Sequence, residues 1–114
     1  SGIFIQRVRS ADGAPVMLEN NYYLYDKYSF LLTEPLDGSL YDLLRSKGVV
    51  IGCSQHSYID AIKASGKHAA LLDISPGDPL FLLYTELYDI QNELVYIGKQ
   101  IIIAAKYRFN YENS

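Results

Sequence analysis

The alternation of apolar and polar residues along the 114-residue chain mostly follows the two-residue period of β-strands. The Asp12-Gly13 pair favours a tight turn, so the segments on either side of it are predicted to form an antiparallel hairpin. A polar turn at residues 90–93 predicts a second hairpin later in the chain. The predicted strands cover residues 3–10, 15–24, 49–64, 79–89, 94–104 and 107–111.

Helical patterns occupy shorter stretches between these strands. Ser39 is a good N-cap, Asp42 follows it as in a capping box, and Gly48 provides a stop. The apolar face of this helix consists of Leu40, Leu43 and Leu44. Residues 66–72 predict a second short helix, and residues 26–30 predict a helical turn or a loop. Strands in hairpins with short helices indicate an α+β domain on a mainly antiparallel sheet.

Composition limits the number of domains and the kinds of partner. A chain of 114 residues holds one domain, and its hydrophobic content of 49% is typical of a globular protein. Ten Lys and Arg against thirteen Asp and Glu give a formal charge of −3, which argues against a surface that grips nucleic acid through phosphates. The sequence has no apolar stretch long enough to span a bilayer and no signal peptide.

Cysteine usage and the start of the chain add two expectations. Cys53 is the single cysteine, which excludes an internal disulfide and fits a reducing compartment such as the cytoplasm. The sequence begins without Met and is already strand-like at Ile3. We therefore expect this chain to be an excised piece of a longer protein.

Three charged residues stand out in the first hairpin. Arg7 and Arg9 are two residues apart on one strand, so both guanidinium groups leave by the same face. They are either an exposed strand edge or an anion site, since two guanidinium groups can hold a phosphate or carboxylate. Glu19 shares that face only if it pairs with Arg7, which a three-residue loop would produce; a two-residue turn would pair it with Gln6.

The helix start at Ser39 is a second candidate for anion contact, because the first backbone N–H groups of a helix are unpaired. Ser39 is equally compatible with an ordinary cap, and Tyr41 could add a hydroxyl or only pack. His56 and His68 are isolated, and no spacing matches a metal site or a catalytic triad. Gly98, inside a strand of large residues, predicts a bulge or a close approach.

Four segments together resemble a known family. "RVRSADGAPVMLENNYY", "GSLYDLL", "AALLDISPGDPLFLLYTELYD" and the closing "YRFNY" are similar to the UTRA domain, the C-terminal effector-binding domain of GntR-family transcription regulators of the HutC type. The resemblance covers essentially the whole chain. It implies a chorismate-lyase-like fold with a six-stranded antiparallel sheet, and a homodimer that senses a small metabolite, often a phosphorylated sugar.

The resemblance also implies roles for individual residues. Arg7, Arg9, Ser39 and Tyr41 match the residues that hold the phosphate in sugar-phosphate sensors, and Glu19 matches the residue that contacts the sugar. Two departures are visible. Tyr96 stands where amino-sugar sensors have a second Glu, and "AAKYRF" lacks the acidic residue that the family usually has there.

The sequence therefore predicts residues 1–114 to be a cytoplasmic, homodimeric effector-binding domain of a bacterial regulator, for example a repressor. We expect no enzyme activity, no cofactor and no membrane contact, and DNA binding only through an N-terminal winged-helix domain absent from this chain. The expected effector-binding residues are Arg7, Arg9, Glu19, Ser39, Tyr41 and Tyr96. Two alternatives remain: a small lyase-type enzyme acting on a carboxylated ring, and a purely structural dimerisation module.

Overall fold

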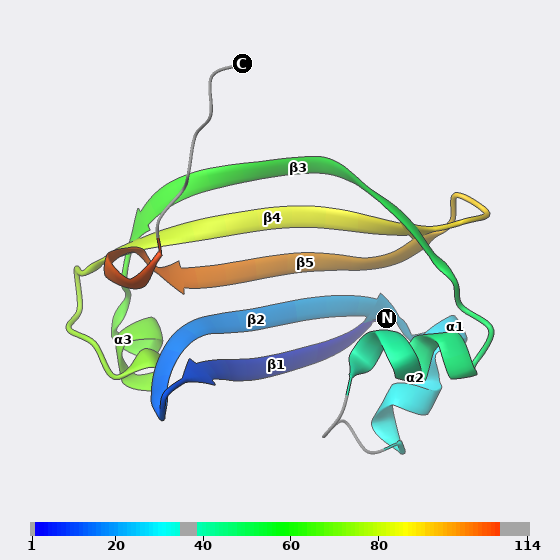
Figure 1. Ribbon diagram of the computed structural model, residues 1–114, viewed down its shortest axis with the longest axis horizontal. Coiled ribbons are helices and arrows are strands. Elements are labelled where there is room, and N and C mark those ends of the chain that lie inside the picture. Colours follow the sequence, from blue (N-terminus) through cyan, green and yellow to red (C-terminus); the bar gives the residue numbers. More distant parts are fainter. Residues whose placement is uncertain (1, 35–38, 108–114) are drawn as a thin grey trace.

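The computed structural model describes residues 2–34 and 39–107, in which one five-stranded sheet has short helices at its two ends (Figure 1). The strand order is β1-β2-β5-β4-β3, and every neighbouring pair is antiparallel. The α+β architecture expected from the sequence is confirmed, and among the described residues the sheet has five strands where the resemblance implied six. The strands are β1 Gly2–Ala11, β2 Ala14–Leu24, β3 Ile51–Lys63, β4 Pro79–Asp89 and β5 Leu94–Ile103.

The helices are short, and in the described part of the chain none has the length and apolar character needed to cross a membrane. The predicted final strand at 107–111 falls mostly outside the described residues, and Tyr107 itself lies outside any strand. The helical elements are α1 Tyr25–Tyr28, η1 Ser29–Leu32, α2 Leu40–Ser46, α3 Gly66–Leu72 and η2 Ala104–Lys106.

The first hairpin combines a two-residue turn with a bulge. Asp12 and Gly13 both have positive φ, 53° and 79°, and Ala11 pairs with Ala14 across them. Of the two possibilities that the sequence leaves open, the structure has the two-residue turn, and the three-residue loop that shared placement of Glu19 was expected to need is absent. The pairing then shifts by one residue between Arg9 and Ser10, because β2 carries an extra residue at this point. The shift brings Arg7 opposite Glu19, so the predicted sharing of one face is confirmed by a different route.

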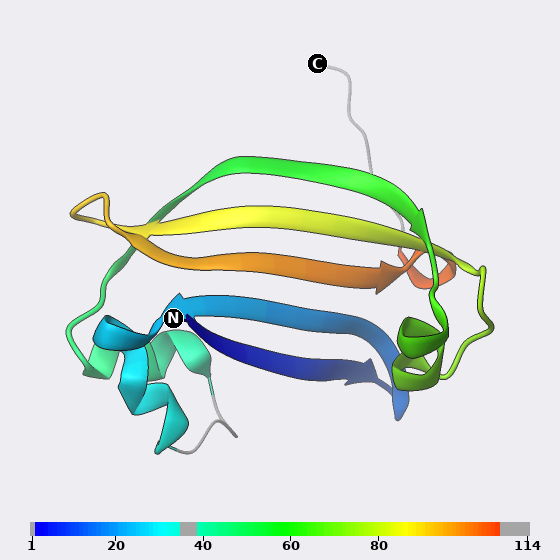
Figure 2. The same ribbon diagram turned by 180° about the vertical axis from the view of Figure 1, so that it is seen from behind.

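Each sheet face is covered at one end by a helix (Figure 1, Figure 2). Leu40 and Leu44 of α2 pack with Tyr23 and Tyr96 in one hydrophobic cluster. Leu72 of α3 belongs to a second cluster, at the opposite end of the sheet and on its other face. Because α2 covers only one end of its face, the middle of that face is left open beside the first hairpin.

The ends of α2 and α3 follow the sequence signals closely. The Ser39 Oγ atom accepts a hydrogen bond from the Asp42 backbone N–H at 3.3 Å, as expected for an N-cap. Gly48 has a φ of 85°, the left-handed conformation that ends a helix at little cost for glycine. The α3 helix covers the predicted residues 66–72, and the Ser65 Oγ atom accepts from the His68 backbone N–H at 3.1 Å.

Candidate functional site

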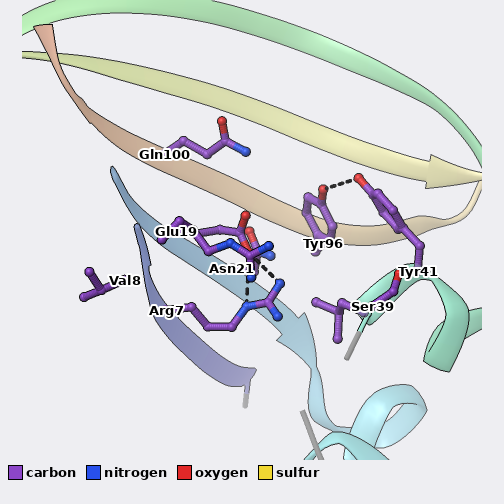
Figure 3. A pocket seen from close by; sticks show the side chains of 10 residues that line it. Arg7, Val8, Glu19, Asn21, Ser39, Tyr41, Tyr96 and Gln100 are labelled. Atoms are coloured by element: carbon purple, nitrogen blue, oxygen red, sulfur yellow. Dashed lines mark hydrogen bonds and ion pairs between the residues drawn. The ribbon is translucent and has the colours of Figure 1, made fainter. Parts of the chain in front are cut away.

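A cavity of about 730 Å³ lies between the first hairpin, β5 and the start of α2 (Figure 3). We call it the hairpin cavity. All six residues predicted for the site line it, although they come from four different elements or their flanks. Its lining consists of Arg7, Val8, Arg9, Glu19, Asn21, Ser39, Leu40, Tyr41, Tyr96 and Gln100.

Arg7 and Glu19 form the strongest polar contact in the hairpin cavity. The Arg7 Nη2 atom lies 2.8 Å from the Glu19 Oε1 atom, and the Arg7 Nε atom donates to the same oxygen at 3.3 Å. Both side chains are largely buried, with exposed fractions of 20% and 17%. Their charges offset each other within the cavity wall (Figure 3).

Arg9 supplies a second cation to the same cavity. It is exposed, and it has no ion pair with any of the described residues. Since Arg7 and Glu19 offset each other, the cavity lining has a net charge of about +1 from Arg9. Such a lining favours an anion over a cation.

Ser39 contributes a hydroxyl at the rim of the hairpin cavity. Its oxygen accepts from the Asp42 N–H, which leaves the hydroxyl hydrogen free to be donated to a ligand. The α2 helix has only seven residues, so its dipole adds little, and most of the attraction for an anion comes from the arginines.

Two tyrosine hydroxyls meet on the opposite wall of the cavity. Tyr41 Oη and Tyr96 Oη are 3.2 Å apart; Tyr96 is buried and Tyr41 is half-exposed. Burial, together with the Tyr41 hydrogen bond, raises the pKa of Tyr96 above its ordinary value, so the hydroxyl stays protonated. One hydrogen lies between the two oxygens, and the other remains available for a ligand.

Gly98 sits beneath this wall at a close approach of side chains, which was one of the two alternatives for it. A Cβ atom built at Gly98 would lie 3.0 Å from Asn21 Oδ1 and 3.0 Å from Tyr96 Cε1. The pairing of β5 with its neighbours is regular at this position, so the glycine marks no bulge.

Sequence reasoning missed Asn21 and Gln100, whose amide side chains also line the hairpin cavity. No sequence signal marked them, because only the strand pairing shows that they share a face with Arg7. Within residues 2–34 and 39–107, no cluster of His, Cys, Asp and Glu could hold a metal ion. Cys53 is exposed and forms no disulfide.

The antiparallel sheet with short end helices and a polar cavity beside the first hairpin has the geometry of a ligand-binding domain. The chain belongs to the UTRA domain family, whose model matches residues 1–108. It is therefore an effector-type domain like those of GntR-family transcription regulators. No protein of curated function matches the sequence.

Solved structures support this assignment. The effector domain of PhnF from Mycobacterium smegmatis is 26% identical with a TM-score of 0.87, and the match covers 99% of this chain and 70% of that one. A GntR-family regulator from Enterococcus faecalis V583 is 25% identical with a TM-score of 0.85, covering 98% and 81%. In another PhnF structure the match covers 48% of the longer chain. The C-terminal domain of Yurk from Bacillus subtilis, 21% identical, shares the fold with a TM-score of 0.87.

Proposed function

We propose that the hairpin cavity binds a phosphorylated sugar or a related anionic metabolite, and that this binding modulates a DNA-binding domain elsewhere in the full regulator. The observation that carries the proposal is the meeting of Arg7, Arg9 and Ser39 around one cavity. The two arginines come from one strand and the serine from a helix start thirty or more residues later. A purely structural role would not require three donors to surround a cavity of about 730 Å³.

The arrangement fits an anion with a polar, neutral body. Arg7 and Arg9 would hold the anionic group through charge-assisted hydrogen bonds, with the Ser39 and Tyr41 hydroxyls as further donors. Glu19 has two carboxylate oxygens, and both of its hydrogen bonds with Arg7 use Oε1. Its Oε2 atom could therefore accept from a sugar hydroxyl, and the Tyr96 oxygen beside Tyr41 could accept from another.

The lining of the cavity favours binding over turnover. Among the described residues that line it, Glu19 is the one carboxylate, and there is no histidine or lysine. Glu19 is paired with Arg7, and burial keeps the Tyr96 hydroxyl protonated, so the lining supplies no second carboxylate, histidine or lysine to share proton transfer with Glu19. A lyase would need such a pair near its substrate.

Regulation would follow from linkage between the effector and the arrangement of a homodimer. The homodimer would exist in two arrangements, and an effector that binds one of them more tightly shifts the population toward it. The shift in free energy is at most the difference between the effector's binding free energies for the two arrangements. The sheet face opposite the cavity carries the exposed aromatic residues Phe4, Tyr22 and Tyr58, which supports dimerisation through this face. DNA contact would come from a domain outside this chain.

Thermal denaturation with a panel of ligands tests the proposal. We expect glucose-6-phosphate and inorganic phosphate to raise the melting temperature, and glucose to have a smaller effect, because a ligand stabilises the state that it binds. Small organic acids at equal ionic strength separate a general anion site from one that needs phosphate. If no anion in the panel shifted the melting temperature, the proposed effector class would be wrong.

A further inference from the structure

A smaller hollow of about 240 Å³ continues from the hairpin cavity across β5 toward β4 and β3. We call it the distal hollow. The two spaces share four lining residues, so a ligand in one can reach the other: these are Asn21, Tyr41, Tyr96 and Gln100. The distal hollow adds five residues from β5 and the neighbouring strands: Ser54, Leu83, Tyr84, Thr85 and Gly98. Neither the family match nor the likeness to solved structures assigns it a role.

The absence of a side chain at Gly98 leaves room for a passage between the hairpin cavity and the distal hollow. A Cβ atom at this position would lie 3.0 Å from both Asn21 Oδ1 and Tyr96 Cε1, and 3.4 Å from Thr85 Cγ2. Gly98 is not among the glycines with positive φ, so its backbone does not require glycine. The absent side chain therefore matters for space, and a methyl group here would narrow the passage.

The chemistry of the distal hollow differs from that of the hairpin cavity. The Thr85 hydroxyl is bonded to the Ser57 hydroxyl at 2.6 Å, and its methyl group is the Thr85 atom nearest to Gly98. Together with Leu83, this gives an apolar floor. The shared amides and tyrosine hydroxyls form a polar rim, and none of the described residues lining the hollow carries a full charge. An occupant should be neutral, with C–H groups on one face and hydroxyls at its edge.

The sheet register aligns the hairpin cavity and the distal hollow along one row of residues that runs across the strands. Arg7, Glu19, Gln100 and Leu83 are successive partners across β1, β2, β5 and β4. With neighbouring strands about 4.8 Å apart, Arg7 and Leu83 are separated by roughly 14 Å across the sheet. A ligand that touches both ends must therefore be elongated.

We propose that the distal hollow is a second subsite for a neutral, hydroxyl-bearing ring, joined to the anionic group that the hairpin cavity holds. This inference rests on the proposed anion site and narrows it to a class of effector: a phosphorylated compound of two rings, such as a disaccharide phosphate or a phosphorylated glycoside. The apolar floor packs against the C–H face of the second ring, and the amides and tyrosine hydroxyls bond its hydroxyls.

Titration calorimetry on the 114-residue chain tests the second subsite. The probes are inorganic phosphate, glucose-6-phosphate, and the phosphorylated forms of sucrose, maltose and cellobiose, which differ in linkage. We expect at least one disaccharide phosphate to bind ten times or more tightly than glucose-6-phosphate. The Gly98→Ala variant should weaken the disaccharide phosphate at least fivefold more than glucose-6-phosphate, because its Cβ atom narrows the passage to the distal hollow while it also presses on the shared Asn21 and Tyr96.

Two further variants keep the test independent of folding defects. Leu83→Ala removes part of the apolar floor without adding volume, and should reduce the gain severalfold. Gly66→Ala is the matched control, because a Cβ atom there would meet nothing within 4 Å, and it should leave every affinity unchanged. Circular dichroism melts establish that each variant is folded.

The outcomes separate this inference from the proposed function. If glucose-6-phosphate binds and no disaccharide phosphate binds more tightly, the second subsite is wrong and the anion site stands. Equal weakening of both ligand classes by Gly98→Ala would also overturn the subsite, because it would show a general disturbance of the cavity. If neither phosphate nor any phosphorylated probe binds, the proposed anion site fails and the second subsite fails with it.

Discussion

Arg7 and Glu19 face each other across the first hairpin, with 2.8 Å between Arg7 Nη2 and Glu19 Oε1. This pairing exists because a bulge in β2 shifts the register by one residue after a two-residue turn. Without the bulge, Glu19 would lie opposite Gln6 and point to the other face. One irregularity in the ladder therefore decides whether the cavity contains an ion pair or two unpaired cations.

Replacing Glu19 by Gln should release Arg7 for anion binding. The neutral amide keeps the shape of the side chain but removes its negative charge from the cavity wall. We expect the affinity for inorganic phosphate to rise at least threefold in calorimetry. The free energy of unfolding should fall by about 1–2 kcal/mol, because the pair is largely buried but the amide oxygen of glutamine can still accept from Arg7. A lower phosphate affinity in the variant would contradict this prediction. It would show that Glu19 mainly positions Arg7 for the anion and does not mainly compete with the anion for Arg7.

Arg9 is predicted to bind the anionic group directly. Charge-assisted hydrogen bonds contribute roughly 1.5–3 kcal/mol each, so Arg9→Ala should weaken glucose-6-phosphate at least tenfold. Little change in stability is expected, because Arg9 is exposed and has no ion pair with the described residues.

Arg45→Ala provides the matched control for Arg9. Arg45 is also exposed, lies in the last turn of α2 and is not part of the cavity lining. It should leave the affinity for glucose-6-phosphate unchanged. Equal loss in both variants would point to a diffuse effect of net charge, and unchanged affinity in Arg9→Ala would contradict its proposed contact with the ligand.

Short-range signals in the sequence predicted the elements better than their register. The cap at Ser39, the stop at Gly48 and the helix at 66–72 all depend on residues within one helical turn, and the structure has each of them. The turn at Asp12-Gly13 and the pairing of Arg7 with Glu19 looked incompatible in sequence. A bulge reconciles them, and it is selected by packing: Leu18 must reach the core beside Ile101.

From the residues alone the site was predictable where they carry charge or a cap, and the expectation for Tyr96 came from the family resemblance. Arg7, Arg9 and Ser39 have such signals, and they do meet around the cavity. Asn21 and Gln100 carry none, because an amide in an apolar strand is equally compatible with a surface position. Their place in the cavity depends on β5 lying beside β2, a contact between segments far apart in the sequence.

Tyr96 should set a preference for neutral sugars over amino sugars. It is buried and its hydroxyl is bonded to Tyr41, so this wall offers an amine no carboxylate. We expect glucose-6-phosphate to bind at least as tightly as glucosamine-6-phosphate. Tyr96→Glu should shift the affinity ratio toward the amino sugar about fivefold, a coupling of ~1 kcal/mol. Tyr96→Phe, which lacks only the hydroxyl, should leave the ratio unshifted; an equal shift in both variants would contradict a charge effect.

Asp89 makes the stability of the β4–β5 turn depend on pH. Its Oδ1 atom accepts from the backbone N–H groups of Glu93 and Gln91, both at 2.9 Å, and Lys27 Nζ lies 3.6 Å from Oδ2. These contacts hold the pKa of Asp89 below its ordinary value. The hydrogen bond from the Glu93 backbone has the largest effect, followed by the hydrogen bond from Gln91 and the charge of Lys27. Its contribution is therefore present above the unfolded pKa of about 3.9 and is lost as pH falls through the folded pKa.

The Asp89→Asn variant tests this dependence by urea unfolding at a series of pH values. The variant should be less stable than the wild type at neutral pH, and the difference should shrink as pH falls below about 4. Asp60→Asn is the control, since Asp60 is exposed on β3. A difference that stays constant over the whole pH range would show that the carboxylate charge of Asp89 is not what stabilises the turn.

The last prediction concerns self-association through the sheet face opposite the hairpin cavity. Asn21 lines the cavity, so its neighbour Tyr22 projects from the other face, where its ring lies 4.9 Å from that of Phe4. Phe4 and Tyr22 are 49% and 41% exposed, a large apolar area for a sheet with no cover there. A stable homodimer through this face would bury about 1,200–2,000 Å² in total, with aromatic residues at its centre.

Sedimentation velocity of the 114-residue chain at micromolar concentration should therefore show a dimer without DNA or any other domain. The double variant Phe4→Ser, Tyr22→Ser should shift the population toward monomer, because it removes the apolar centre of the interface. Leu32→Ser is the matched control: Leu32 is 61% exposed on η1, away from this face, and its loss should leave the dimer intact. A wild-type chain that sediments as a monomer would mean that the regulator dimerises elsewhere. Effector binding could then not act on DNA binding through the sheet face of Phe4 and Tyr22. The two states of the regulator that the effector distinguishes would have to differ at another interface.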